Sequence, residues 1–276
     1  MAQEGGGGGV TVELEHASGA VTEIAAAALT HDGGTFTVSA STRASAKPVL
    51  FLDCDDTLYT NDWLTANAIT RGIESYCMTR LGLEKGRAYE LYKQHGTCLA
   101  GLIAEKIDVD VEDFLTTVHP TREELATTIG PDAALRALIE RIDRSKVEVF
   151  VFTASSREHC ARCLSLLGVD DLLVDKRHPI IDCRSVAPAG FGGTITKHST
   201  QAFAEAQRIA GQPDADKCYF VDDSWSNIRA ATGVGWHAVL LGAVARDGRS
   251  AELLAEKEAM IAEIALLPTM LPDLFL

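Results

Sequence analysis

Three short apolar runs along the chain end in polar side chains, and each is followed by a segment with helical periodicity. Residues 49–57 read Val-Leu-Phe-Leu-Asp-Cys-Asp-Asp-Thr, residues 146–153 read Lys-Val-Glu-Val-Phe-Val-Phe-Thr, and residues 217–224 read Lys-Cys-Tyr-Phe-Val-Asp-Asp-Ser. Strands that alternate with helices predict a parallel sheet, in which the carboxyl ends of the strands meet at one edge. Because ligands bind at that edge, the polar ends of the three runs are expected to form one site.

The pattern between the first two runs is helical throughout, with apolar residues at helical spacing in segments 68–81 and 88–102. Helices inserted at this point can cover the carboxyl edge while the chain returns to complete the sheet. The sequence therefore predicts an α/β fold with a Rossmann-like parallel sheet core and an inserted all-helical cap. We assign residues 47–63 and 133–276 to the core and residues 64–132 to the cap.

The remaining core pattern predicts a short strand near Leu172, a strand at 238–241 and a last amphipathic helix over 250–266. Residues 1–46 are a separate N-terminal extension, either flexible or a small accessory hairpin. Segments 10–16 and 35–39 alternate like strands, and Asp32-Gly-Gly marks a turn, but few large apolar residues are available to bury.

Length, charge and cysteine content narrow the class of protein. The 276 residues can bury the core of one domain with an insertion, and the net charge of −14 disfavours nucleic acid polymers and anionic membrane surfaces as partners. There is no run of 18 apolar residues that would span a membrane. The odd number of cysteines, seven, and the lack of a signal peptide predict free thiols in the cytoplasm, with the nucleus open. Both a monomer and a homodimer remain open.

Asp53 and Asp55 follow the first apolar run two residues apart, where a continuing strand would place both carboxylates on one side. Two adjacent anions are costly unless a cation lies between them. Mg²⁺ prefers carboxylate and carbonyl oxygens and keeps coordination positions for a substrate phosphate. The alternative is a polar turn that ends the strand and begins a helix.

Four groups of polar residues occur in one order along the chain: Asp53, Asp55 and Thr57, then Thr153, then Lys197, then Asp222 and Asp223. In this order they resemble the four motifs of phosphatases of the haloacid dehalogenase superfamily. Segments 92–102, 132–138, 222–228 and 267–275 look like one branch, the pyrimidine 5'-nucleotidase-like proteins of fungi and plants.

The resemblance covers roughly residues 47–276 and departs from the branch at two positions. Ala154 stands where Asn is usual, and His198 stands where Pro is usual. Both positions neighbour the expected phosphate pocket, so they bear on the choice of substrate.

The resemblance implies a Mg²⁺-dependent phosphatase with a C1-type helical cap and an aspartyl-phosphate intermediate. Asp53 would be the nucleophile and Asp55 the general acid and base, its pKa raised by burial and by Asp53. The remaining roles fall into two sets: phosphate would be bound by Thr153, Ala154 and Lys197, and the metal by Asp53, the carbonyl of Asp55, Asp222 and Asp223.

The implied substrate is a small phosphorylated metabolite, and the branch suggests a nucleoside 5'-monophosphate. Tyr92 and His95 are candidates to contact its base or sugar, although an aromatic at helical spacing is more often part of a core. A broad phosphatase acting on sugar phosphates or pyridoxal phosphate would use the same chemistry. A non-catalytic interaction protein with this fold is the rival of another class, but it would have no physical reason to cluster four carboxylates.

Overall fold

The computed structural model describes residues 29–32, 35–38, 47–187, 196–242 and 256–276, and the chain divides into two compact units, Met1–Ala44 and Ser45–Leu276. In the first unit, β1 (Leu29–Asp32) pairs antiparallel with β2 (Thr35–Val38). The predicted strand at 35–39 is therefore present, and its partner precedes the predicted turn. The strand predicted at 10–16 lies outside the described residues.

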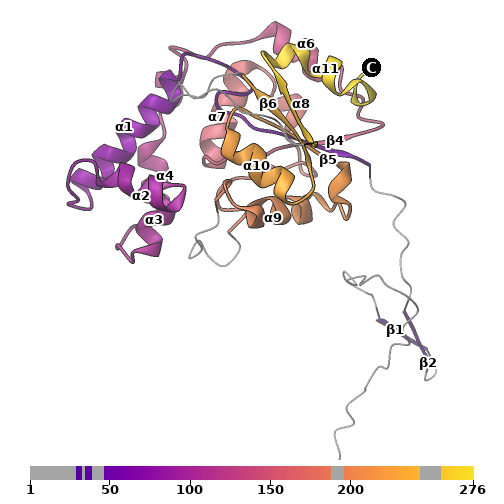
Figure 1. Ribbon diagram of the computed structural model, residues 1–276, viewed down its shortest axis with the longest axis horizontal. Helices are drawn as coiled ribbons and strands as arrows, with labels where there is room; N and C mark the ends of the chain where they lie inside the picture. The colour runs from indigo at the N-terminus through magenta and orange to yellow at the C-terminus, as the bar shows by residue number, and fades with distance from the viewer. Residues whose placement is uncertain (1–28, 33–34, 39–46, 188–195, 243–255) are drawn as a thin grey trace, which may run out of the picture. The chain divides into compact units, whose positions relative to one another are not determined.

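Five parallel strands form the sheet of the second unit, in the order β4-β3-β5-β6-β7. They are β3 (Val49–Leu52), β4 (Glu148–Val151), β5 (Cys218–Asp222), β6 (His237–Leu241) and β7 (Glu258–Ile261). Since all strands run the same way, their carboxyl ends lie on one edge of the sheet (Figure 1). β3 lies between β4 and β5, so the residues after β3 are flanked by the ends of both neighbours.

The helices of the second unit occur in chain order between and after these strands. Those before β4 are α1 (Leu64–Thr79), α2 (Arg87–His95), α3 (Cys98–Ala104), α4 (Val111–Val118), α5 (Arg122–Leu125) and α6 (Ala133–Glu140). Those after β4 are α7 (Arg157–Leu167), α8 (Asp170–Leu173), α9 (Thr200–Ala210), α10 (Trp225–Gly233) and α11 (Leu267–Met270), with 3-10 turns at Ala215–Lys217, Ile264–Leu266 and Pro272–Leu274.

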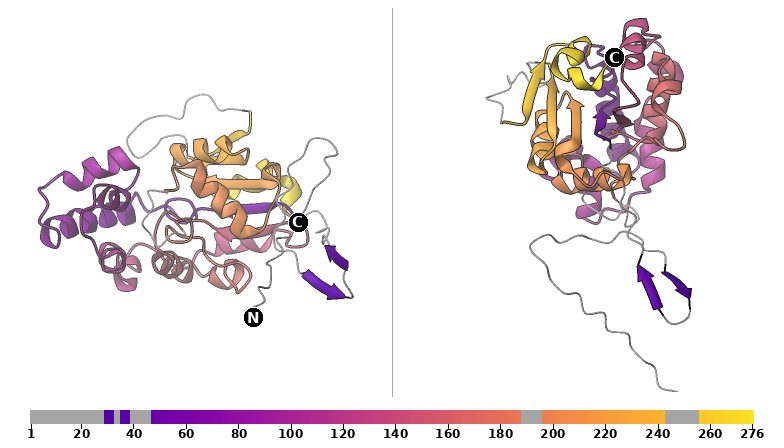
Figure 2. Two further views of the ribbon diagram at one scale, coloured as in Figure 1. Left: turned by 90° about the horizontal axis from the view of Figure 1, so that it is seen from below. Right: turned by 90° about the vertical axis from the view of Figure 1, so that its right-hand side faces the viewer.

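The sheet is buried on both faces, which explains why its strands are apolar runs without alternation. Leu50 and Leu52 of β3 join a core formed with α6 and α7, whereas Val49 and Phe51 join a core formed with α9 and α10. Successive strand residues point to opposite faces, so one strand serves both cores. Two further views show the helical layers around the sheet (Figure 2). The predicted α/β fold with a Rossmann-like parallel sheet is confirmed.

The inserted helices α1 to α4 have an apolar core of their own and lie to one side of the sheet (Figures 1 and 2). Tyr76, Leu91 and Phe114 are among the residues buried in it. The helix predicted over 88–102 is two helices, because Gly96 has a positive φ of 83° and ends α2. The side chain of Thr97 then accepts a hydrogen bond from the Ala100 amide and begins α3.

The end of the predicted cap segment packs differently. Leu125 of α5 and Ile129 belong to the core on the α7 side of the sheet, not to the core of the inserted helices. These two residues thus pack with the sheet core, and the boundary between cap and core at residue 132 remains a prediction from sequence. No helix among the described residues has the length and apolar character to cross a bilayer.

Two predicted core elements are wrong. The strand expected near Leu172 is the short helix α8, and part of the helix expected over 250–266 is the strand β7. Residues 250–255 of that segment lie outside the described residues. β7 pairs in parallel with β6, with Glu258 opposite Ala238. The sequence there is rich in helix formers, but pairing with an existing sheet edge outweighs local propensity.

α1 and α4 approach each other closely at Gly72. A Cβ atom on Gly72 would lie 2.6 Å from the carbonyl oxygen of Val118. We expect Gly72→Ala to lower the melting temperature, because separating the helices costs about 1–3 kcal/mol. Most of that range exceeds the ~1 kcal/mol that alanine gains in helix propensity.

Thermal unfolding measures this effect. Gly130→Ala is the matched control, because a Cβ atom at Gly130 would have no neighbour within 4 Å. A melting temperature for Gly72→Ala at or above that of the wild type would contradict the close approach.

Candidate active site

Three carboxylates gather at the carboxyl edge of β3 and β5. Oxygens of Asp53, Asp222 and Asp223 lie within 4.8 Å of one another. The amide of Asp53 donates to the carbonyl of Val221 at 3.0 Å, which keeps the chain beside β5 after β3 has ended. The structure thus brings together three of the predicted site residues from two strands.

Lys197 lies buried in the midst of these acids. Its ammonium group donates to Asp53 Oδ1, to Asp222 Oδ2 at 2.8 Å and to the carbonyl of Phe152 at 2.7 Å. Burial by itself lowers the pKa of Lys197, but the charges of Asp222 and Asp53 outweigh it and raise the pKa above its ordinary value. The lysine is therefore held as a cation, as its predicted role requires.

One ammonium group does not balance three carboxylates. Burial raises the pKa of Asp53 to about 7, against the opposing effect of Lys197. Burial, with the charges of Asp222 and Asp53, raises the pKa of Asp223 to about 9. A divalent cation would relieve this crowding, and a set of carboxylate oxygens is the donor chemistry that suits Mg²⁺. The residues present therefore fit the metal that the sequence predicts.

Asp222 and Asp223 differ in how far their oxygens are already occupied. Asp222 accepts hydrogen bonds from the Ser224 amide at 2.7 Å and from Asn227 Nδ2 at 3.0 and 3.1 Å, in addition to its contact with Lys197. Within the described parts of the chain, Asp223 accepts no hydrogen bond. Asp223 thus has more lone pairs available for a cation.

Asp55 points away from this group. Its carboxylate accepts hydrogen bonds from Tyr59 Oη at 2.6 Å, His159 Nε2 at 2.8 Å and Ser155 Oγ at 2.9 Å. The expected side-by-side placement with Asp53 does not occur, because β3 ends at Leu52 and the chain turns.

The expected rise in the pKa of Asp55 is wrong for this structure. Although burial raises it, the charge of His159 and the three hydrogen bonds hold the pKa of Asp55 below its usual range.

His159 is a site residue that sequence reasoning missed. Ser156 caps α7 by accepting a hydrogen bond from the His159 amide, which places the imidazole ring one turn into the helix. Burial lowers the pKa of His159, but the charge of Asp55 outweighs it and raises the pKa to about 10. The sequence does hold a signal for this histidine. Ser156, three residues after Thr153 and three before His159, is a residue type that typically begins a helix.

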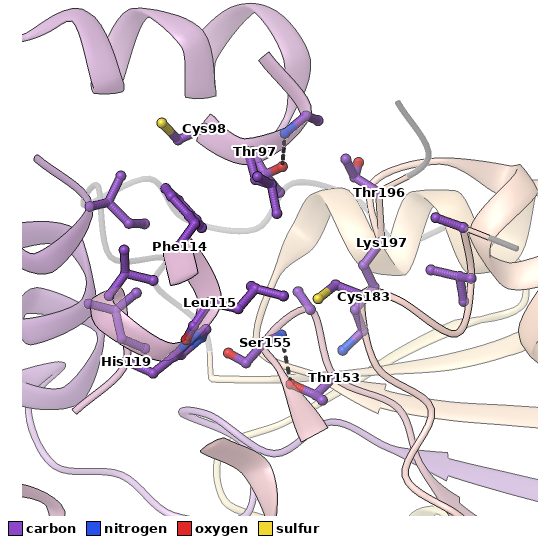
Figure 3. Close-up of a pocket in the computed structure, with 18 of the residues that line it drawn as sticks. Thr97, Cys98, Phe114, Leu115, His119, Thr153, Ser155, Cys183, Thr196 and Lys197 are labelled. Atoms are coloured by element: carbon purple, nitrogen blue, oxygen red, sulfur yellow. Dashed lines mark hydrogen bonds between the residues drawn. The ribbon is translucent and has the colours of Figure 1, made fainter. Parts of the chain in front are cut away.

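Thr153 and Ala154 follow β4 and line a cavity of about 170 Å³ together with Lys197 (Figure 3). Thr153 is buried, and its hydroxyl accepts a hydrogen bond from the Ser155 amide at 3.0 Å. The inserted helices close the cavity with mostly apolar side chains: Ile69, Ile73, Leu99, Phe114, Leu115 and Val118.

The two residues predicted to contact the substrate from the cap do not line this cavity. Tyr92 is 49% exposed and stacks on Tyr89, with 6.1 Å between the ring centroids. His95 lies on α2 near Glu105, at 3.7 Å from Nε2 to Oε1. His119, which the sequence did not single out, does line the cavity.

The fold and the acid-lysine edge define the chain as an α/β protein with a Rossmann-like parallel sheet and a polar site at its carboxyl edge. Residues 47–235, more than half of the chain, match the family of haloacid dehalogenase-like hydrolases, and the chain belongs to this family. Phosphate metabolism protein 8 of Saccharomyces cerevisiae is 27% identical over 203 residues, which cover 71% of this chain and 61% of that protein. The chain thus matches less than two thirds of the length of this relative.

Solved structures share the fold at low sequence identity. A hydrolase from Pseudomonas syringae superimposes with a TM-score of 0.51 and 17% identity, covering 82% of this chain and 98% of that chain. A haloacid dehalogenase-type hydrolase from Bacillus subtilis, solved with magnesium bound, gives a TM-score of 0.50 and 13% identity, covering 82% and 99%.

The crowding of acids predicts a pH-dependent instability of the metal-free protein. Because the folded state raises the pKa of Asp223 from 3.8 to about 9, it binds more protons than the unfolded state between these values. Stability therefore falls as pH rises through this window. Asp223→Asn removes the charge, so it should raise the melting temperature in EDTA at pH 8 by on the order of a few degrees. The gain in melting temperature should be smaller at pH 5, where the carboxyl of Asp223 is protonated in the folded wild type.

Differential scanning fluorimetry at both pH values, with EDTA and with Mg²⁺, checks this expectation. The exposed Asp108→Asn is the control for removing a carboxylate elsewhere. If Mg²⁺ stabilises Asp223→Asn as much as the wild type, Asp223 does not contribute to the cation site.

Proposed function

We propose that the protein is a Mg²⁺-dependent phosphomonoesterase that forms an aspartyl-phosphate on Asp53. The observation that carries this proposal is the group of Asp53, Asp222 and Asp223 around the buried Lys197 at the carboxyl edge of the sheet. Phosphoryl transfer requires a positioned nucleophile and positive charge around the transferring group. This edge offers a carboxylate nucleophile, a lysine and oxygen ligands for a cation.

The contacts of Asp53 suit it to attack phosphorus. Lys197 engages Oδ1, and the hydroxyl of Thr57 donates to Oδ2 at 3.2 Å, so the carboxylate has little freedom to rotate. Mg²⁺, bound by Asp53, the carbonyl of Asp55, Asp222 and Asp223, would supply charge to the transferring phosphoryl group. Thr153, the backbone of Ala154 and Lys197 would bind the phosphate oxygens at the start of the cavity.

Asp55 would act as the general acid and base. The ionised form held here by His159, Tyr59 and Ser155 suits the second step, in which Asp55 takes a proton from the attacking water. The first step requires a proton for the leaving alcohol. The hydroxyl of Tyr59 is the nearest donor to Asp55, at 2.6 Å, but burial raises its pKa far above the usual range. The better proton source is the Nε2–H group of His159, 2.8 Å from Asp55 Oδ1.

For the substrate, the similarity to the pyrimidine 5'-nucleotidase-like branch favours nucleoside 5'-monophosphates. The name of the yeast relative, a phosphate metabolism protein, and the magnesium in the Bacillus subtilis structure support phosphate chemistry with this cation. The cavity of about 170 Å³ with apolar walls instead favours the second candidate, a broad phosphatase for compact metabolites such as sugar phosphates or pyridoxal phosphate.

The cellular location belongs to the same proposal. All seven cysteines are free, which fits a reducing compartment such as the cytoplasm or nucleus.

The nucleophile assignment is tested by Asp53→Asn. The amide is nearly isosteric with the carboxylate but cannot attack phosphorus, so we expect turnover to fall by roughly 10⁴-fold or more. Mg²⁺-dependent release of phosphate from p-nitrophenyl phosphate and from a panel of nucleoside and sugar monophosphates measures it. Asp62→Asn, at an exposed position of the same loop, is the control. Residual activity near that of the control would remove Asp53 from this role.

The acid role is tested by Asp55→Asn with two leaving groups. p-Nitrophenolate leaves without a proton, whereas a sugar or nucleoside alkoxide requires one, so the loss should be about 10²–10⁴-fold greater on the alkyl esters. The quantity to compare is kcat for each ester class in the wild type and the variant. Equal losses on both classes would mean that Asp55 does not protonate the leaving group.

A further inference from the structure

His119 takes its position from the way α4 ends. Pro120 follows it, and a residue before proline favours extended backbone angles. His119 accordingly has φ −90° and ψ 137°, which ends the helix at Val118. The ring folds back over the last helical turn, and Nδ1 lies 2.7 Å from the carbonyl oxygen of Leu115.

This contact fixes the tautomer of the ring. A carbonyl oxygen can only accept, so Nδ1 must carry the hydrogen, and in the neutral ring Nε2 is left as an acceptor. Burial lowers the pKa of His119 to about 4, with the charge of His159 acting in the same direction, so the ring is neutral at physiological pH. Across the described ranges, no residue donates a hydrogen bond to Nε2, which keeps some contact with solvent although His119 is only 7% exposed.

The ring of His119 lies beside the expected proton donor. The ring centroids of His119 and His159 are 4.8 Å apart, and His159 Nε2 is 2.8 Å from Asp55. His119 lines the same cavity as Thr153 and Ser155 (Figure 3). A substrate bound with its phosphate near Thr153 and Lys197 would extend into the cavity that His119 also lines.

Little else on the cap side of this cavity can recognise a polar leaving group. The neighbouring side chains from the inserted helices are mostly apolar, and the hydroxyl of Thr97 accepts from the Ala100 amide and keeps its own O–H as a donor, whereas His119 Nε2 is an acceptor. A ligand that displaces solvent from this acceptor without supplying a donor would leave it unpaired, so a ligand that supplies the donor gains relative to one that does not. The unpaired Nε2 is thus a selective element in an otherwise apolar wall.

We propose that His119 is a specificity residue, whose Nε2 accepts a hydrogen bond from a hydroxyl group one or two carbons from the ester oxygen of the substrate. This inference rests on the phosphomonoesterase function proposed above. It assigns the preferred substrates to phosphate esters of hydroxylated alcohols and disfavours esters of simple alkyl alcohols of the same size.

A matched pair of esters tests the proposal. Glycerol 1-phosphate and n-propyl phosphate share a three-carbon skeleton and differ in the hydroxyl groups. The ratio of their kcat/KM values is measured for the wild type and for His119→Phe, which keeps a ring against His159 but removes the acceptor. Comparing the two ratios cancels the intrinsic reactivity of the esters. We expect the preference for glycerol 1-phosphate to be about tenfold smaller in His119→Phe, the size of one neutral hydrogen bond.

Three further variants make the result specific. His119→Gln keeps a neutral acceptor and should restore part of the preference. Ile73→Val trims the apolar wall and should change both esters by the same factor. Tyr92→Ala tests the cap residue first expected to contact the substrate. Melting temperatures show that each variant is folded.

The outcomes separate this inference from the proposed function. No Mg²⁺-dependent hydrolysis of p-nitrophenyl phosphate or of either alkyl ester by the wild type would overturn both. Hydrolysis of p-nitrophenyl phosphate without a preference for glycerol 1-phosphate would overturn only the role of His119. The same holds if the ratio is unchanged in His119→Phe or if it changes in Tyr92→Ala instead.

Discussion

The ammonium group of Lys197 joins the ends of three neighbouring strands. It contacts Asp53 after β3, the carbonyl of Phe152 after β4 and Asp222 at the end of β5. A buried charge is tolerated only when it is paired and hydrogen-bonded, and removing one partner leaves the others uncompensated. The geometry of the acid group, the turn after β3 and the floor of the cavity therefore depend on this one side chain.

The same region shows how two aspartates two residues apart acquire opposite properties. Burial among other carboxylates raises the pKa of Asp53 to about 7, whereas His159 and two hydroxyl groups hold the pKa of Asp55 below its usual range. Environment, not residue type, would thus separate the proposed nucleophile from the proposed acid-base group. Because the pKa of Asp55 is lowered, in the proposed mechanism its proton for the first step would arrive when substrate binds or come from His159.

The sequence predicts the sheet edge well and the cavity wall poorly, for physical reasons. The apolar strands of a parallel sheet and their polar ends are local patterns, so Asp53 and Asp222 can be placed from sequence. Lys197 follows no apolar run and is placed only by its order among the four motifs. β7 cannot be predicted from sequence, because Glu258–Ile261 lies in a run of helix formers and becomes a strand only by pairing with β6. His119 and His159 are single residues far along the chain from Asp55, and only the tertiary fold brings them near it.

The strand order has a consequence for synthesis of the protein on the ribosome. β3 emerges early and pairs on one side with β4, but its other side pairs with β5, where Val49 lies opposite Cys218. Until β5 is made, the nascent chain carries an apolar strand with an unsatisfied edge, a state prone to aggregation. The inserted helices make local contacts and can pack in the meantime, while Asp222 and Asp223 arrive only with β5. The proposed cation site is thus among the last features that the growing chain can assemble.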